Sequence, residues 1–123
     1  MELTETHLRY LLTIYELAQT TPDVGAAGVA RALNVTKPSV TRMLGILMDK
    51  GLLVRERYGK IYLTDIGFLL AKGFRRRVEA LKERIPAMAL ELTEEELLNT
   101  ACLLAASLPE HALKALEEPL PAV

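Results

Sequence analysis

The sequence predicts a mainly α-helical fold with one small β-hairpin. Apolar residues recur at intervals of three and four along most of the chain, which is the spacing of one helix face. Three threonines, Thr36, Thr64 and Thr93, stand where capping residues begin helices. Two short apolar runs flank a turn that contains glycine, a pattern typical of a hairpin. Half of the 123 residues are apolar, enough for a core without disulfide or metal support.

The N-terminal segment predicts two helices. The first covers residues 5–20 and ends at Pro22 and Gly25. The second is short and covers residues 27–33, and a tight corner follows it. The apolar face of the first helix holds Leu8, Leu11, Leu12 and Tyr15.

A third helix begins after Thr36, a good N-cap, and has Pro38 in its first turn, where proline is tolerated. It is predicted to reach Lys50, with Gly51 as its C-terminal stop. We expect Val40, Leu44, Leu47 and Met48 to be buried. The opposite face is small, polar and partly basic, and consists of Pro38, Ser39, Thr41, Arg42, Gly45 and Asp49.

The hairpin is predicted from residues 52–56 and 61–63, with a turn at residues 57–60. Two strands alone are marginally stable, so the hairpin must pack against the helices. Thr64 then caps a long helix, residues 65–85, which ends at Pro86. The buried stripe of this helix is Leu70, Phe74, Val78, Leu81 and Ile85.

The C-terminal segment predicts two more helices. Thr93 followed by Glu96 is a capping-box signature, and the helix that it opens reaches about Ser107. Pro109 begins a last short helix. Leu, Ala and Met dominate residues 87–108, so that the helix is apolar around most of its surface. We expect a second copy of the chain to cover one side of it, although it could instead fill the core of its own subunit.

This order of helix, short helix, turn, capped helix and hairpin is the layout of a winged helix-turn-helix domain. We therefore predict a DNA-binding domain at residues 1–64 and a helical dimerisation domain at residues 65–123. The third helix would enter the major groove, where Arg42 can donate a bidentate pair to guanine. The predicted DNA-binding residues are Thr36, Lys37, Pro38, Ser39, Thr41 and Arg42 on the helix, and Arg57 and Lys60 on the hairpin, where Arg55 would also meet phosphates.

Charge is sorted along the chain, although the net charge is only −1. Residues 25–84 hold 13 Lys and Arg against five Asp and Glu, a charge of +8. The flanking residues 1–24 and 85–123 carry −3 and −6. The basic middle contains the predicted helix-turn-helix and favours double-stranded DNA as the partner. The alternative is a structural or protein-binding module whose basic residues are only a solvated face.

Five stretches of the chain, at residues 10–17, 35–44, 51–54, 61–67 and 76–77, resemble the iron- and manganese-dependent repressors of the diphtheria toxin repressor family. They keep the family order over about residues 3–108. The resemblance implies a short two-domain member that binds operator DNA as a homodimer, with Pro38 and Arg42 approaching bases.

The resemblance also implies Mn or Fe as a cofactor, but the metal ligands of the family are missing. The family has an Asp or Met followed by Glu on the first helix, a His on the long helix and a Glu-x-x-Glu-His pattern on the next. The matching positions here are Arg9, Leu12, Val78, Cys102, Ala105 and Ala106. Leucine, valine and alanine offer no donor atom and arginine repels a cation. We therefore predict no metal site and no cofactor, and expect side-chain packing to replace the metal.

The leading hypothesis is a cytoplasmic, sequence-specific transcriptional regulator, a repressor that acts as a homodimer without catalysis. The single cysteine and the lack of a long apolar run favour a reducing compartment and no membrane. A small-molecule or redox effector acting through Cys102 could be the trigger instead of metal, and a winged helix that binds protein rather than DNA is the third hypothesis. No Ser-His-Asp or Cys-His arrangement and no phosphate-binding glycine loop supports an enzyme.

Overall fold

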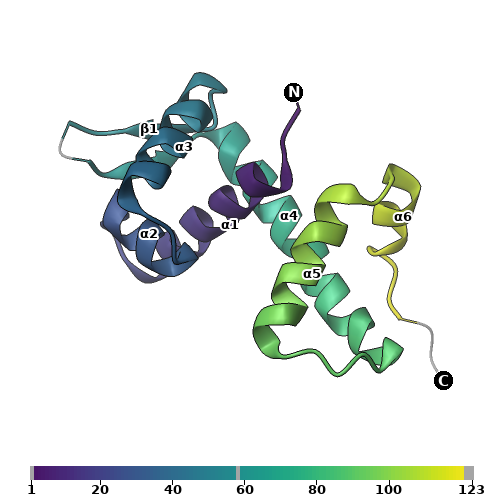
Figure 1. Ribbon diagram of the computed structural model, residues 1–123. Helices are drawn as coiled ribbons and strands as arrows, with labels where there is room; N and C mark the ends of the chain where they lie inside the picture. Colours follow the sequence, from purple (N-terminus) through teal and green to yellow (C-terminus); the bar gives the residue numbers. More distant parts are fainter. Residues whose placement is uncertain (1, 58, 121–123) are drawn as a thin grey trace. The chain divides into compact units, whose positions relative to one another are not determined.

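Six α-helices and one hairpin make up the computed structural model, which describes residues 2–57 and 59–120 (Figure 1). The chain divides into two compact units, Met1–Lys72 and Gly73–Val123. The predicted mainly α fold is confirmed. Its elements are α1 (Glu5–Thr20), α2 (Ala26–Leu33), α3 (Lys37–Asp49), β1 (Leu53–Arg55), β2 (Ile61–Leu63), α4 (Asp65–Arg84), the 3₁₀ helix η1 (Ile85–Met88), α5 (Glu94–Ser107) and α6 (Glu110–Ala115).

The hairpin forms as the sequence predicts, with strands that are short. β1 and β2 are antiparallel, and Leu53 lies opposite Leu63. Their first residues, Leu53 and Ile61, are buried, whereas the pair Val54 and Tyr62 is exposed. The hairpin therefore packs one face, the one that carries Leu53 and Ile61, onto the helices. Tyr58, in the predicted turn, lies outside the described residues.

One apolar core holds the first unit together. α1 packs against α2, α2 against α3, and α3 against β1. Removing these side chains from water supplies the main driving force for the fold. The fully buried members are Leu11, Val29, Val40, Leu44, Leu47, Leu52 and Ala71, and Tyr10, Ile14, Val24, Ala26, Leu53 and Ile61 complete the cluster with less than a tenth of their surface exposed.

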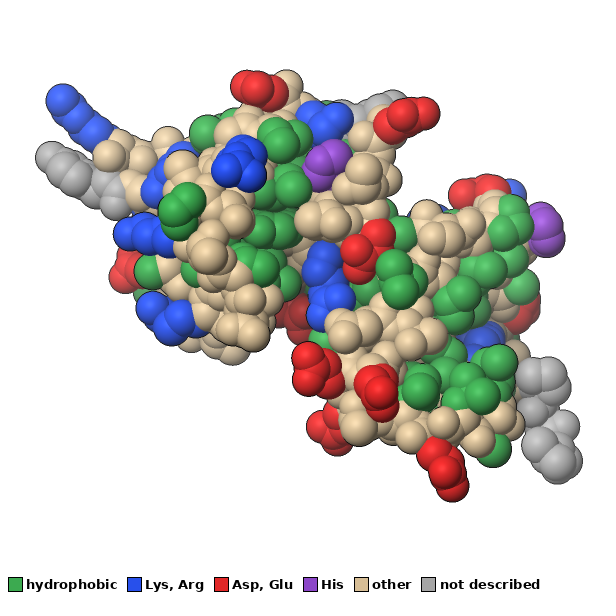
Figure 2. Space-filling model, viewed as in Figure 1, with side chains coloured by type: hydrophobic (Ala, Val, Ile, Leu, Met, Phe, Trp, Pro, Cys, Tyr) green, Lys and Arg blue, Asp and Glu red, His purple; other side chains and the backbone are tan. Residues whose placement is uncertain are grey.

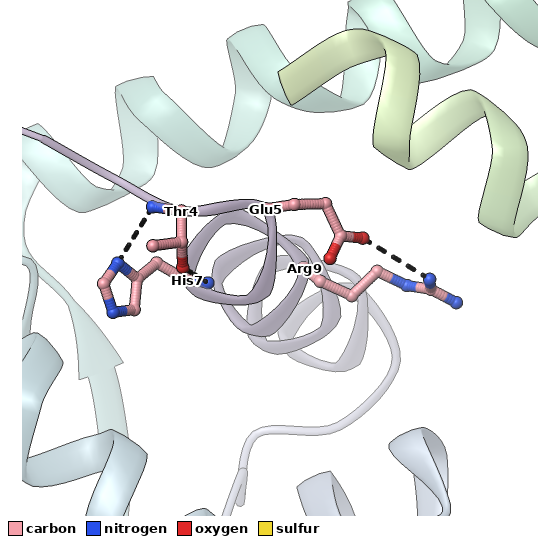
Figure 3. A network of polar contacts seen from close by, with 4 residues as sticks. All are labelled: Thr4, Glu5, His7 and Arg9. Atoms are coloured by element: carbon pink, nitrogen blue, oxygen red, sulfur yellow. Dashed lines mark hydrogen bonds and ion pairs between the residues drawn. The ribbon is translucent and has the colours of Figure 1, made fainter. Parts of the chain in front are cut away.

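A capping box begins α1, and Figure 3 shows it. The Thr4 hydroxyl accepts a hydrogen bond from the His7 backbone N–H at 3.2 Å, and His7 Nδ1 accepts one from the Thr4 backbone N–H at 3.0 Å. Histidine thus takes the place that Glu or Gln usually fills. Partial burial, with a smaller contribution from the Lys50 charge, lowers the pKa of His7 and keeps Nδ1 available as an acceptor near neutral pH.

α3 follows the predicted pattern with one exception. Thr36 caps it, and Val40, Leu44 and Leu47 are buried. Met48 was expected to be buried with them, and this was wrong, because 38% of its surface is exposed. Positions 40, 44 and 47 already fill the facing surface, and Met43, on the other side of the stripe, is the methionine that packs partly against the core.

A tight corner joins α3, the hairpin and α4. Gly51 has a φ of +73° and ends α3 as predicted. The Thr64 hydroxyl donates to the Gly51 carbonyl at 2.7 Å and accepts from the Gly67 N–H at 3.1 Å. This places the first turn of α4 so close to the chain at Leu52 that a Cβ on Gly67 would overlap the Leu52 carbonyl. Glycine is therefore required at position 67.

The second unit has its own buried side chains on three helices. α4 buries Phe74, Val78 and Leu81, as its apolar stripe predicts, and Ile85 follows in η1. The Thr93–Glu96 capping box begins α5, with Thr93 N–H donating to Glu96 Oε1 at 2.8 Å. α5 buries Ala101, Cys102 and Ala105, and α6 buries Leu113. Within the described residues, no helix is both long and apolar enough to cross a membrane.

Substitution of Gly67 tests the close packing of α4 against the chain at Leu52. Gly67→Ala should lower the free energy of unfolding by about 2–3 kcal/mol, because the new methyl group overlaps backbone and cannot be accommodated by a rotamer change. Gly73→Ala in the same helix is the matched control. A Cβ there meets no atom within 4 Å, so this substitution should stabilise the protein by about 0.5–1 kcal/mol. Urea unfolding followed by circular dichroism measures both, and equal effects would contradict the proposed packing.

Candidate nucleic-acid interface

The outer face of α3 is fixed by the side chains on its inner face. Burial of Val40, Leu44 and Leu47 directs the opposite side of the helix to solvent. Pro38, Thr41 and Arg42 are exposed there, at intervals of three and four that place them on one surface. The outer face therefore offers a flat apolar ring, a hydroxyl and a guanidinium group within about one helical turn.

The N-terminus of α3 is held by a small hydrogen-bond network. Thr36 Oγ1 accepts from the Ser39 backbone N–H at 3.3 Å and donates to Ser39 Oγ at 2.8 Å. Ser39 is half-buried, whereas Thr36 and Lys37 are exposed. The structure thus uses the Ser39 hydroxyl inside the cap and presents Lys37 at the positive end of the helix dipole.

The hairpin, or wing, carries the remaining predicted cations. Arg55 and Arg57 are exposed and Lys60 is half-buried. Lys60 Nζ lies 5.1 Å from the centre of the Tyr62 ring and 3.7 Å from Asp23 Oδ1. A hydrogen bond to the Tyr62 side chain, with the charges of Asp23 and Glu56 adding to it, raises the pKa of Lys60. Its ammonium group therefore stays charged at neutral pH.

The α1–α2 loop forms a groove with the wing and the start of α3. The groove has a volume of about 470 Å³. The carbonyl of Val24 accepts a hydrogen bond from the Ile61 N–H at 2.9 Å, which ties the loop to β2. The α1–α2 loop was not predicted as part of the interface. The residue pattern of the loop does not show that it lies beside residues far along the chain. The groove is lined by residues 23–27, Lys37, Arg55, Glu56, Gly59 and Lys60.

Basic side chains outnumber acidic ones along α2, α3 and the wing. On the face shown in Figure 2, Lys and Arg side chains gather on the first unit toward the hairpin, and Asp and Glu side chains are prominent on the second. The sequence already places a +8 segment between acidic ends. The cations near α3 and the wing are therefore not neutralised by an equal number of acids in that region.

In the family that the sequence resembles, certain positions carry metal ligands. The residues at these positions of this chain do not fit a metal ion. Arg9 forms an ion pair with Glu5 at 3.8 Å, as Figure 3 shows. Leu12 and Val78 are buried and have no donor atom. Within residues 2–57 and 59–120, no group of three or more His, Cys, Asp or Glu is placed to hold a metal. The remaining positions are Cys102 and Ala105, which are buried, and Ala106, which is half-buried.

The helical core, the capped third helix and the hairpin together define a winged helix-turn-helix DNA-binding domain. Residues 2–61 match the model of the family described as iron dependent repressor, N-terminal DNA binding domain. The match covers just under half of the chain.

Several solved structures have a similar fold. The manganese regulator SloR has a TM-score of 0.78 at 22% identity, over 95% of this chain and 53% of that one. IdeR of T. acidophilum has a TM-score of 0.70 at 23% identity, over 94% and 53%. The apo form of the manganese-activated repressor ScaR has a TM-score of 0.65 at 28% identity, over 89% and 51%. The chain spans about half the length of these relatives.

Proposed function

We propose that this protein is a sequence-specific transcriptional repressor that binds operator DNA as a homodimer and catalyses no reaction. The observation that carries the proposal is the exposed face of α3, with Pro38, Thr41 and Arg42 side by side and the cations of the wing near its start. An α-helix such as α3, with polar side chains on its exposed face, fits the major groove of DNA. The match of residues 2–61 to a family of DNA-binding domains supports the same partner.

The predicted residues divide into two roles. Arg42 can pair with the O6 and N7 atoms of guanine, and Pro38 can contact the methyl group of thymine. Thr41 lies beside Arg42 and would contact a neighbouring base or phosphate. The other residues would position the domain on the sugar-phosphate backbone, and they are Thr36, Lys37, Ser39, Arg55, Arg57 and Lys60.

Homodimer formation is proposed for the second unit. Met88, Leu90 and Leu103 are each more than half exposed, which is costly for apolar side chains in a free monomer. Leu90 also lines a groove of about 290 Å³, together with Ile85, Pro86, Ala89, Glu91, Leu92 and Leu97. A two-fold dimer would place two recognition helices about 34–36 Å apart, the spacing of successive major grooves.

We further propose that DNA binding does not require Mn²⁺ or Fe²⁺. SloR and ScaR are described as manganese-responsive, but the side chains at the corresponding positions of this chain include leucine, valine and alanine. These cannot coordinate an ion. Cys102 is fully buried, and reactive thiols are usually at least partly accessible, so a redox trigger at this residue is the weaker alternative.

Arginine substitutions separate base recognition from backbone contact. Arg42→Ala should weaken operator binding by about 1–3 kcal/mol and reduce the ratio of operator to random-duplex affinity, because a bidentate base contact is lost. Arg57→Ala should weaken binding to both duplexes and flatten the salt dependence, because one phosphate contact is lost. Fluorescence anisotropy, with an operator first selected from genomic DNA, measures both. If the wild type retains no duplex even at low salt, a protein-interaction module is the better interpretation.

Metal dependence can be tested on the same complex. Operator affinity should be unchanged, within about twofold, between buffer with EDTA and buffer with excess Mn²⁺, because leucine, valine or alanine occupies four of the six positions where the resemblance implies metal ligands. Mg²⁺ at equal ionic strength controls for screening of the phosphates. Loss of binding in EDTA that Mn²⁺ or Fe²⁺ restores, and Mg²⁺ does not, would overturn this proposal.

The dimer interface is tested by placing a charge in the apolar groove. Leu90→Glu should shift the protein from dimer to monomer in sedimentation equilibrium, raising the dissociation constant at least tenfold, because the carboxylate would be buried unpaired. Ile66→Glu is the matched control, since Ile66 is similarly exposed, at 57% against 53%, but lies in the first unit. A wild-type protein that is monomeric at all concentrations would contradict the homodimer.

A further inference from the structure

The α1–α2 loop holds one acidic side chain at a defined place beside the wing. Val24 and Ile61 are both buried, and the hydrogen bond between their backbones fixes the loop against β2. The Thr21 hydroxyl also accepts from the Asp23 N–H at 3.2 Å. The backbone at Asp23 therefore stays beside the hairpin as long as Val24 and Ile61 remain buried and hydrogen-bonded.

Asp23 and Lys60 meet at the edge of the groove. Asp23 Oδ1 lies 3.7 Å from Lys60 Nζ, but the Asp23 side chain is 81% exposed and that of Lys60 only 32%. The Tyr62 ring lies against the Lys60 ammonium. The lysine is thus the more constrained partner, and the carboxylate can rotate into solvent. An ion pair this exposed contributes about 0–1 kcal/mol, so another anion can replace the carboxylate.

The other charges of the groove favour such an anion. Lys37 approaches from the start of α3 and Arg55 from β1. The Arg55 guanidinium lies over the turn, with Nη2 3.5 Å from where a Cβ of Gly59 would be. Glu56 is the second acid of the lining, so the groove holds three cations and two carboxylates. Displacing Asp23 from Lys60 gives a local excess of positive charge suited to a phosphate.

We propose that this groove is a subsite for one backbone phosphate of duplex DNA, and that Asp23 competes with that phosphate for Lys60. The inference rests on the proposed DNA-binding function. The carboxylate then lowers affinity for every duplex, because phosphate contacts read no sequence. The carboxylate thus sets how strongly the protein holds any duplex at a given salt concentration and leaves the ratio of operator to random-duplex affinity unchanged.

Removal of the carboxylate charge is the direct test. Asp23→Asn should raise the affinity for a random-sequence duplex about two- to fivefold at moderate salt, as expected from releasing an exposed ion pair. The slope of log K against log salt should steepen by up to about 0.9, the value for one additional phosphate contact. Operator affinity should rise by a similar factor. Fluorescence anisotropy over a range of NaCl concentrations measures all three.

Two further variants make the result specific. Glu16→Gln removes one exposed acid of α1 outside the groove, and it should change affinity much less than Asp23→Asn if proximity to Lys60 matters. Lys60→Gln should itself weaken binding and should abolish the gain from Asp23→Asn in the double variant. The Asp23 side chain is exposed, so Asp23→Asn should retain the helical circular dichroism of the wild type.

The outcomes distinguish failure of the phosphate subsite from failure of the proposed DNA-binding function. Equal effects of Asp23→Asn and Glu16→Gln, or an undiminished gain in the Lys60→Gln background, would overturn the subsite while wild-type DNA binding stands. Failure of the wild type to bind any duplex at low salt would overturn the DNA-binding proposal and the subsite with it.

Discussion

Burial of three side chains on one face of α3 is the constraint on which the rest of the interface depends. Val40, Leu44 and Leu47 have no solvent-exposed surface, so α3 cannot rotate about its axis without creating cavities or exposing apolar area. This fixes Pro38 and Arg42 on the outside. The Thr36 cap then sets where the helix begins, and hence how far the outer face extends. Recognition and stability are therefore two consequences of the same packing.

The wing is positioned by backbone contacts rather than by its own two strands. Thr64 bonds to Gly51, and the absence of a side chain at Gly67 lets α4 approach the chain at Leu52. On the other side, the Val24 carbonyl holds Ile61. A hairpin of three-residue strands would be marginal alone. These anchors fix where the hairpin lies on the first unit, and with it the place of Arg55 and Lys60.

The candidate site was partly predictable from the sequence. The Thr36 cap and the outer positions of α3 follow from helix periodicity, since the buried and exposed residues of one helix constrain each other locally. The ion pair of Asp23 with Lys60 and the engagement of Ser39 in the cap were not predicted. The first depends on a contact between distant segments, and the second on a rotamer that no spacing rule specifies. Met48 shows the same limit, because periodicity placed it in the buried stripe, whereas packing leaves it exposed and sets Met43 partly against the core.

The sequence by itself determined the mainly helical fold, the order of its elements, the face that α3 exposes, and the leucine, valine and alanine at four of the six positions where the resemblance implies metal ligands. These properties reside in residue identity and local periodicity, which are readable without coordinates. Tertiary structure alone decided which segments share a surface. The α1–α2 loop joins Lys37, Arg55 and Lys60 in one groove because buried side chains and a backbone hydrogen bond draw distant parts of the chain together. Electrostatics in such a groove depends on distances in space, which the linear order of charges does not contain.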